Sequence, residues 1–249
     1  MKVIIVENYE EASQEAAKIF INQVKENPQS ILGLATGSTP IRMYELLRED
    51  HEKNHTSYKD VKSYNLDEYF GLDASHPQSY HYFMYKNLFD HININPENIH
   101  IPNGMTDDVD AECERYDELI KEAGGVDIQV LGIGNNAHIG FNEPTINFEK
   151  GTHLVQLEDS TIEANSRFFD NIEDVPKKAI TMGVGSIFKS RKIMLIATGE
   201  NKAEAIYNTV YGKVVPEVPA SILQFHSDIV LILDKEAAKL LKEEDYKIA

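Results

Sequence analysis

Short apolar runs alternate along the chain with longer stretches in which apolar residues recur every three or four positions. The short runs are rich in Val, Ile and Leu with little apolar–polar alternation, which is typical of strands buried on both faces of a sheet. Because these runs alternate with helical patterns, we expect βα units and an α/β fold with a parallel sheet. The predicted strands cover residues 3–6, 31–35, 61–66, 126–131, 179–182, 192–197 and 229–233.

Two of the intervening stretches have clear helix ends. Residues 12–24 place their apolar side chains on one face, and Pro28 ends that helix. Residues 109–123 show the same spacing, and the glycine pair at 124–125 provides a C-terminal stop.

Further along, Ser160 and Glu163 have the spacing of a capping box, which predicts that a helix starts at Ser160. No linker, repeat or low-complexity segment divides the chain. We therefore expect residues 1–249 to form a single domain.

The chain is strongly acidic, with 41 Asp and Glu residues against 24 Lys and Arg residues and a net charge of −17. The electrostatic field of this negative charge repels phosphate backbones and anionic lipids, so we expect no nucleic-acid partner and no membrane partner. An anionic small molecule would require a local cationic site on this protein.

The cysteine and histidine content argues against a metal site. The single cysteine, Cys113, allows neither an internal disulfide nor a thiolate cluster, and a small core residue is its simplest role. The nine histidines include no His-x-x-x-His pair with an acid between, so we expect no metal. The first apolar run is too short for a signal segment and no stretch is long enough to cross a bilayer, which favours a cytoplasmic location.

Ligands of open parallel α/β sheets bind beyond the carboxyl ends of the strands, so the segments that follow the predicted strands are the places to look for chemistry. The first is Thr36-Gly37-Ser38-Thr39-Pro40. Thr39 is a good N-cap, Pro40 suits the first position of a helix, and Gly37 permits a sharp turn. Backbone N–H groups and hydroxyls at a helix N-terminus form an anion site, although an ordinary capped turn is an equally good interpretation.

A second turn, Thr198-Gly199, repeats the pattern and is followed by Lys202 near a helix start. A lysine in that position opposes the helix dipole unless an anion offsets it. The alternative is a surface lysine.

Asp67 and Glu68 follow the predicted strand 61–66 and precede an aromatic-rich stretch. A carboxylate that is partly desolvated there has a raised pKa and becomes a better base. Consecutive side chains diverge, so the two acids are expected to do different work. A helix N-cap is the competing interpretation for Asp67.

The most unusual segment is residues 132–144. Gly132 and Gly134 suggest a dinucleotide-binding fingerprint, but the glycines do not lead directly into a helix and no acid follows at the required place. What the segment offers is the imidazole of His138, flanked by polar groups that include Asn136 and Glu143. A histidine oriented by an amide or a carboxylate can act as a general base near neutral pH.

Segments 65–69, 132–144 and 164–169 together closely resemble the glucosamine-6-phosphate deaminase family, and the similarity covers nearly the whole chain. The resemblance implies a Rossmann-like open, mostly parallel sheet with helices on both faces. It also implies that glucosamine 6-phosphate and water are converted to fructose 6-phosphate and ammonia, with an amino sugar phosphate as the partner and no cofactor.

The resemblance also assigns roles to residues. His138 corresponds to the base that opens the sugar ring, Glu143 and Asn136 to its relay partners, and Asp67 to the base that takes the C2 proton. The substrate-binding residues that it implies are Thr36, Gly37, Ser38, Thr39, Gly132, Arg167 and Lys202.

Two departures from the family pattern change the expectations. Many members carry aspartate where this chain has Asn136, and an amide cannot balance an imidazolium charge, so more of that role should fall on Glu143. Allosteric hexameric relatives carry arginine and lysine where this chain has His153 and Val155. We therefore expect no activation by N-acetylglucosamine 6-phosphate, and a monomer or small homo-oligomer.

Two other functions are compatible with parts of this pattern. A 6-phosphogluconolactonase-like hydrolase shares the histidine loop, but that family continues it with a Ser-Leu-Phe-Pro-like run, whereas this chain has residues 141–144 as Phe-Asn-Glu-Pro. A non-catalytic sugar-phosphate sensor of a transcription regulator needs a basic helix-turn-helix, which neither terminus offers. Such a sensor also has no need of both Asp67 and His138.

Overall fold

The computed structural model describes residues 1–166, 169, 171–242 and 247–248. Across these residues an eight-stranded sheet, parallel throughout, runs through the molecule. In spatial order its strands are β11 (Lys247–Ile248), β1 (Lys2–Val6), β10 (Ile229–Asp234), β9 (Lys192–Ala197), β6 (Ile128–Leu131), β2 (Ile31–Leu34), β3 (Lys62–Asn65) and β5 (Ile99–His100). Six of the seven predicted strands belong to this sheet.

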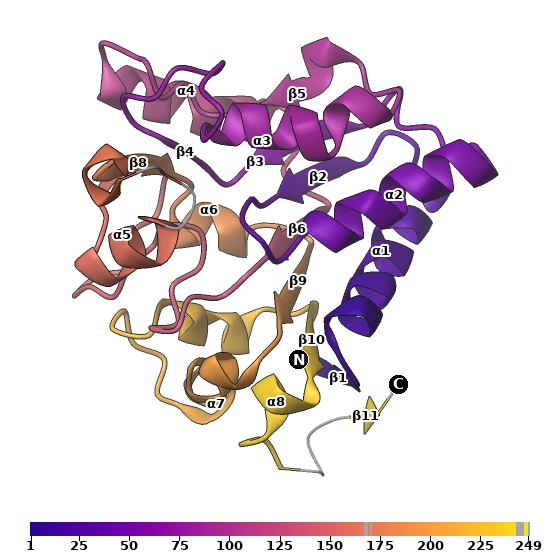
Figure 1. The fold of residues 1–249 in the computed structure, drawn as a ribbon, viewed down its shortest axis with the longest axis vertical. Helices are drawn as coiled ribbons and strands as arrows, with labels where there is room; N and C mark the ends of the chain where they lie inside the picture. Colours follow the sequence, from indigo (N-terminus) through magenta and orange to yellow (C-terminus); the bar gives the residue numbers. More distant parts are fainter. Residues whose placement is uncertain (167–168, 170, 243–246, 249) are drawn as a thin grey trace.

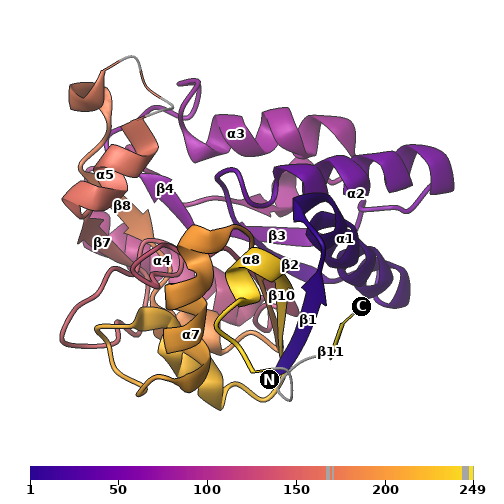
Figure 2. The ribbon, with the colours of Figure 1, turned by 60° about the horizontal axis from the view of Figure 1, so that its bottom comes forward.

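Helices cover both faces of the sheet, as expected for an α/β fold (Figures 1 and 2). Helices α1 and α2 lie on one face, while α4 and α7 lie on the other. The helices are α1 (Tyr9–Glu26), α2 (Ile41–Asn54), α3 (Tyr80–Asn87), α4 (Val109–Glu122), α5 (Asp159–Asn165), α6 (Val184–Phe188), α7 (Ala203–Tyr211) and α8 (Lys235–Ala238). Short 3₁₀ turns are η1 (Phe89–His91), η2 (Pro96–Asn98), η4 (Ile172–Asp174), η5 (Glu200–Lys202) and η6 (Pro219–Phe225). No helix within the described residues is long and apolar enough to span a membrane.

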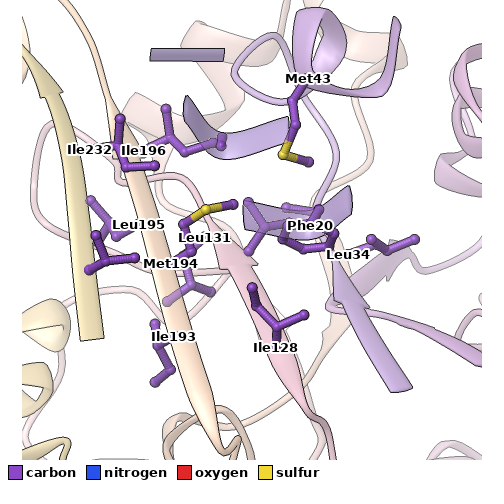
Figure 3. Close-up of a cluster of buried hydrophobic side chains, with 14 of the residues drawn as sticks. Phe20, Leu34, Met43, Ile128, Leu131, Ile193, Met194, Leu195, Ile196 and Ile232 are labelled. Carbon is purple, nitrogen blue, oxygen red and sulfur yellow. The ribbon is translucent and has the colours of Figure 1, made fainter. Parts of the chain in front are cut away.

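The main hydrophobic core lies between the sheet and its helices. Figure 3 shows Phe20 of α1 and Met43 of α2 beside Leu34 of β2 and Ile128 and Leu131 of β6, and all five side chains are fully buried. Burial on this scale is the main force that holds the helices on the sheet.

The two helices with clear sequence signals are confirmed. The side chain of Asn8 accepts the Glu11 N–H and caps α1, which ends at Asn27. Helix α4 starts after Asp108, whose carboxylate accepts the Ala111 N–H. It ends at the predicted glycine pair, residues 124–125, and both glycines have positive φ.

Two predicted helix starts are wrong. Helix α2 begins at Ile41, one residue after Pro40, and Thr39 does not cap it. The Arg42 N–H at that end donates instead to the hydroxyl of Tyr9 on α1, so a tertiary contact replaces the local cap. Helix α5 begins at Asp159 with Glu158 as its N-cap, so the helix starts before residue 160, where the sequence predicted its start.

The strand predicted at 179–182 exists, but it does not belong to the parallel sheet. It forms β8 (Lys178–Thr181) of a small antiparallel sheet with β4 (Asp67–Tyr69) and β7 (His153–Gln156). The chain leaves the main sheet after β3 at Leu66, whose carbonyl oxygen accepts the Met182 N–H at 2.7 Å. Period-two patterning cannot tell which sheet a short apolar run joins.

The arrangement of four strands positions the candidate site. The segments singled out from sequence follow β9, β6, β2 and β3, and these four strands are consecutive neighbours in the sheet. Because the strands are parallel, their carboxyl ends lie along one edge.

Candidate active site

A cavity of about 500 Å³ lies at this edge, a size typical of small-molecule sites. Segments that are far apart in sequence meet in its wall. The expected site residues that line it are Thr36, Gly37, Ser38, Thr39, Asp67, Gly132, Asn136, His138 and Lys202. Asp67 and His138 therefore face the same space, as the functional interpretation requires.

The turn after β2 supplies the hydroxyl-rich wall. Gly37 has φ +84°, a conformation that L side chains rarely adopt. The Tyr9 hydroxyl donates to the Ser38 carbonyl oxygen at 3.0 Å and fixes the turn from α1. A Cβ at Gly132 would lie 3.5 Å from the Thr39 hydroxyl oxygen, so the loops after β2 and β6 pack closely. The turn and the N-terminus of α2 thus present polar groups to the cavity.

The turn after β9 differs from the expectation of a second open anion site. The Gly199 N–H donates to both carboxylate oxygens of Asp234, at 3.0 and 2.9 Å. Asp234 also accepts the Ala237 N–H and caps α8. A carboxylate already occupies the anion-binding position of this turn, so its contribution to the cavity is Lys202.

His138 belongs to a hydrogen-bonded chain with Asn136 and Glu143. The Asn136 amide nitrogen donates to Glu143 Oε2 at 2.9 Å, and Asn136 Oδ1 lies 2.7 Å from His138 Nδ1. Because a carboxylate only accepts hydrogen bonds, this order fixes the amide and requires the proton of a neutral imidazole to be on Nδ1. Nε2 is then the nitrogen that can accept a proton.

Glu143 lies behind these two residues, and its side chain does not line the cavity. Its Oε2 lies 3.3 Å from His138 Nδ1, and Thr161 of α5 donates a hydrogen bond to Oε1. Burial acts to raise the pKa of Glu143, but the hydrogen bond and charge of His138, with hydrogen bonds from Thr161 and Asn136, outweigh it and lower the pKa. The ionised carboxylate is placed where it could balance a positive charge on His138.

The loop after β6 wraps around the imidazole instead of entering a helix. The Gly134 N–H donates to the His138 carbonyl oxygen at 2.9 Å, and a Cβ at Gly134 would lie 2.3 Å from the imidazole ring. Ala137 has φ +65°. Residues 132–144 contain no helix, which excludes the dinucleotide-binding geometry.

Asp67 begins β4 and is 5% exposed. Among the described residues its carboxylate has no hydrogen bond and no ion pair. A Cβ at Gly140 would lie 3.5 Å from Asp67 Oδ2, so the backbone of the histidine loop passes close to this carboxylate. Burial, with a smaller contribution from the charge of Glu68, raises the pKa of Asp67 to about 8. A carboxyl with this pKa can exchange a proton near neutral pH. Because Asp67 begins a strand, it is not the helix cap that was the alternative.

The structure adds wall residues that sequence reasoning missed. Tyr80, Phe141 and Thr161 line the same cavity, and the Tyr80 and Phe141 rings stack with centroids 5.9 Å apart. The signal for Tyr80 was Ser79, a good N-cap, which places a helix start immediately before it. Arg167, which the family resemblance assigns to phosphate binding, lies outside the described residues.

Metal ligands do not gather at the site. In the part of the chain that the structure describes, no group of three or more His, Cys, Asp or Glu side chains could hold a metal ion.

Comparison with known proteins identifies the family. Residues 7–231 match the model of glucosamine-6-phosphate isomerases/6-phosphogluconolactonase. The chain belongs to this family. Two relatives, both glucosamine-6-phosphate deaminases, are aligned over 248 residues and 100% of both chains: that of Clostridium botulinum (strain Eklund 17B / Type B) is 64% identical and that of Clostridioides difficile (strain 630) is 56% identical.

Solved structures of family members agree with the fold. A monomeric glucosamine-6-phosphate deaminase superposes with a TM-score of 0.94 at 46% identity, covering 96% of this chain and 100% of that one. The 6-phosphogluconolactonase of Trypanosoma cruzi superposes with a TM-score of 0.78 at 19% identity, covering 97% of both chains, and that likeness concerns the fold alone. The resemblance and the fold class inferred from the sequence are both confirmed.

The unpaired burial of Asp67 leads to a prediction about stability. The pKa of Asp67 is raised to about 8 in the folded protein from the ordinary aspartate value of about 4, so between these values the folded state binds a proton that the unfolded state has lost. Stability contributed by this residue is therefore lost as pH rises from about 4 to about 8. We expect Asp67→Asn to stabilise the protein at about pH 8, by at most about 5 kcal/mol, and little at about pH 4. Urea unfolding at the two pH values measures this.

Glu143→Gln is the matched control, because the pKa of that carboxyl is lowered. A lowered pKa contributes stability above the unfolded-state pKa, so this variant should be destabilised near neutral pH. Equal effects of the two substitutions would contradict the electrostatic difference between the two carboxylates.

Proposed function

We propose that this chain converts glucosamine 6-phosphate and water into fructose 6-phosphate and ammonia. The observation that carries the proposal is one small cavity that contains a hydroxyl-rich turn at a helix N-terminus, a buried unpaired carboxylate and an oriented imidazole. An anion anchor and two different bases are what a phosphorylated sugar needs for ring opening followed by proton transfer. Relatives at 56–64% identity that are glucosamine-6-phosphate deaminases support this choice.

Residues 36–39 and Lys202 bind the phosphate in this proposal, with Gly132 beside them and Arg167 joining them as the family pattern implies. The phosphate is distant from the reacting carbons, so holding it orients C1 and C2 between the two bases. The cationic and N–H groups of this site attract the phosphate locally, although the protein as a whole carries a charge of −17.

His138 opens the ring. Its Nε2 accepts the proton of the C1 hydroxyl, the C1–O5 bond breaks, and the imidazolium gives that proton to O5, which leaves an open-chain aldehyde and a neutral imidazole. Asn136 holds the imidazole in the required tautomer, and Glu143 stabilises the imidazolium while it carries the extra proton.

Asp67 then acts on the open chain. The C2 hydrogen is acidic only beside the aldehyde, and the Asp67 carboxylate takes it to give an enolate, which becomes an enolamine when O1 takes up a proton. The same carboxyl returns its proton to C1 while the nitrogen loses one proton, which balances the proton gained by O1, so C2 becomes an imine. Water adds to that carbon and ammonia leaves, which yields the ketose. A carboxyl with a pKa of about 8 suits both halves of this transfer because it binds and releases a proton near neutral pH.

We further propose a cytoplasmic, cofactor-free enzyme that acts as a monomer or small homo-oligomer. The structural relative that is a monomeric deaminase supports the small assembly. The lactonase alternative is less favoured because the lactonase relative shares 19% identity, against 46% for the deaminase structure. A sensor would not need the pairing of Asp67 with His138 in one cavity.

The first test follows fructose 6-phosphate and ammonia together after purified protein is incubated with glucosamine 6-phosphate. Asp67→Asn should abolish turnover and leave substrate affinity within a few-fold, because the amide keeps the shape of the side chain but cannot take a proton. Isothermal titration with the variant measures the affinity. Turnover retained by Asp67→Asn would remove Asp67 from its role, and a wild-type protein that releases no ammonia would refute the function.

The role of His138 has its own test. His138→Gln should slow the reaction of the cyclic sugar by about 10²–10⁴-fold, the usual contribution of a positioned acid–base group. If ring opening then limits the rate, the isotope effect on kcat/KM for substrate deuterated at C2 should fall toward unity. An isotope effect that stays at the wild-type value would place His138 in the C2 step instead.

Regulation can be tested directly. Because His153 and Val155 replace the cationic pair of allosteric relatives, N-acetylglucosamine 6-phosphate should leave the substrate saturation curve hyperbolic and unshifted. Initial rates across substrate concentrations with and without this compound measure the effect. A lowered half-saturation concentration would show that an effector site exists without those two residues.

A further inference from the structure

Glu68, the neighbour of Asp67, is a buried carboxylate that the proposed chemistry does not use. Both residues belong to β4, where successive side chains point to opposite faces. Asp67 lines the cavity, and Glu68 points away from it and is 3% exposed. A charged group buried to this extent is expected to have a specific set of partners.

Those partners are backbone N–H groups. Glu68 Oε1 accepts the N–H of Tyr69 and that of Tyr80, and Oε2 accepts the N–H of His81, each at 2.8 Å. Among the described residues it has no cationic partner. Three N–H donors satisfy a carboxylate well, and two of these belong to the first turn of α3.

The contacts connect two elements that both contribute to the cavity wall. Helix α3 begins at Tyr80, whose ring lines the cavity, and β4 begins at Asp67. Ser79 completes the arrangement, since its hydroxyl accepts the Tyr82 N–H at 3.0 Å. Side chains therefore satisfy the otherwise unpaired N–H groups at the start of α3.

The space around Glu68 is closely filled. A Cβ at Gly104 would lie 2.1 Å from the Tyr69 carbonyl oxygen and 3.2 Å from Glu68 Cγ. A side chain at Gly104 would push this segment away, so the packing leaves the carboxylate of Glu68 little freedom.

Glu68 also contributes to the electrostatic environment of Asp67. Burial raises the pKa of Glu68 to about 7, although the three N–H groups act to lower it. Its charge is a further cause, after burial, of the raised pKa of Asp67. The other titratable groups around Asp67 are the phenols of Tyr44, Tyr80 and Tyr116, whose pKa values are raised mainly by burial, and they stay neutral. His138 and Lys202 line the same cavity as Asp67.

We propose that Glu68 is a positioning residue for the Asp67 base, because its carboxylate fastens the first turn of α3 to β4 and fixes Asp67 and Tyr80 at the cavity. The inference rests on the proposed function. Glu68 does not line the cavity, so its effect is on the placement and basicity of Asp67 and not on substrate contact.

Three variants separate the effect of the length of the Glu68 side chain from the effect of its charge. Glu68→Gln keeps the size but removes the charge, and its amide nitrogen cannot accept a hydrogen bond from the N–H that the replaced oxygen held. Glu68→Asp keeps the charge but is too short to reach all three donors. Ser79→Ala is the matched control, because it removes a hydrogen bond from the same helix end without changing any charge beside Asp67.

The measurement is kcat and KM for glucosamine 6-phosphate across pH, with the wild type assayed in parallel. We expect kcat to fall about tenfold to a hundredfold in Glu68→Gln and in Glu68→Asp, the range for a displaced catalytic group, with KM changed less than about threefold. As a base, Asp67 must be deprotonated, so kcat rises with pH as Asp67 loses its proton. That rise should move to lower pH in Glu68→Gln, because loss of the adjacent negative charge favours ionised Asp67, and should stay in place in Glu68→Asp.

In Ser79→Ala, kcat should rise at the same pH as in the wild type, and its value should stay within about twofold of wild type. A Glu68→Gln enzyme with unchanged kcat and pH dependence would overturn the inference, and so would an equal shift in Ser79→Ala. If Glu68→Gln does not fold, wild-type kcat in Glu68→Asp overturns the inference by itself. Wild-type protein that releases no ammonia would refute the proposed function and the inference with it, whereas active wild type with fully active Glu68 variants refutes the inference alone.

Discussion

A carboxylate buried without a partner is the feature on which the rest of the site depends. Asp67 is 5% exposed, and among the described residues no cation or hydrogen-bond donor compensates it. Such a group opposes folding when it is charged, so the surrounding structure must hold it in place. The parallel sheet and its main core supply that stability, while β4 carries Asp67 out of the sheet to the cavity. The same burial that opposes folding raises the pKa of Asp67 to about 8, so that this carboxyl can exchange a proton near neutral pH.

The imidazole of His138, the other base of the proposed reaction, has hydrogen-bonding partners, in contrast to Asp67. His138 is held by Asn136, and Glu143 stands behind both with a lowered pKa. Burial without a hydrogen-bond partner thus keeps Asp67 weakly acidic, whereas hydrogen bonds keep Glu143 ionised. Because their pKa values differ, the two acids have different tasks in the proposed reaction: Asp67 transfers a proton and Glu143 stabilises the imidazolium. The proposed reaction uses no metal and no cofactor.

The sequence predicted most of this arrangement because strand ends in parallel sheets converge. Buried apolar runs gave six strands of the main sheet, and the polar residues after four of them met at one edge. Errors arose where tertiary contacts overrule local signals. Tyr9, which is far from Thr39 in the chain, caps α2, and Asp234 occupies the turn at Gly199. Pairing of β8 with β4 depends on a long-range contact that no local pattern encodes.

The junction between the two sheets has a consequence for local opening. Leu66 packs in the large hydrophobic cluster, whereas Tyr69 belongs to a small separate one with Phe141, and Asp67 stands between them. Small clusters are the parts of a protein that open first, often while the main core stays intact. If the small cluster opened, water would reach Asp67 and restore its ordinary acidity. The raised pKa of Asp67 therefore depends on an intact neighbouring cluster, and local opening there would lower it while the main core stays closed.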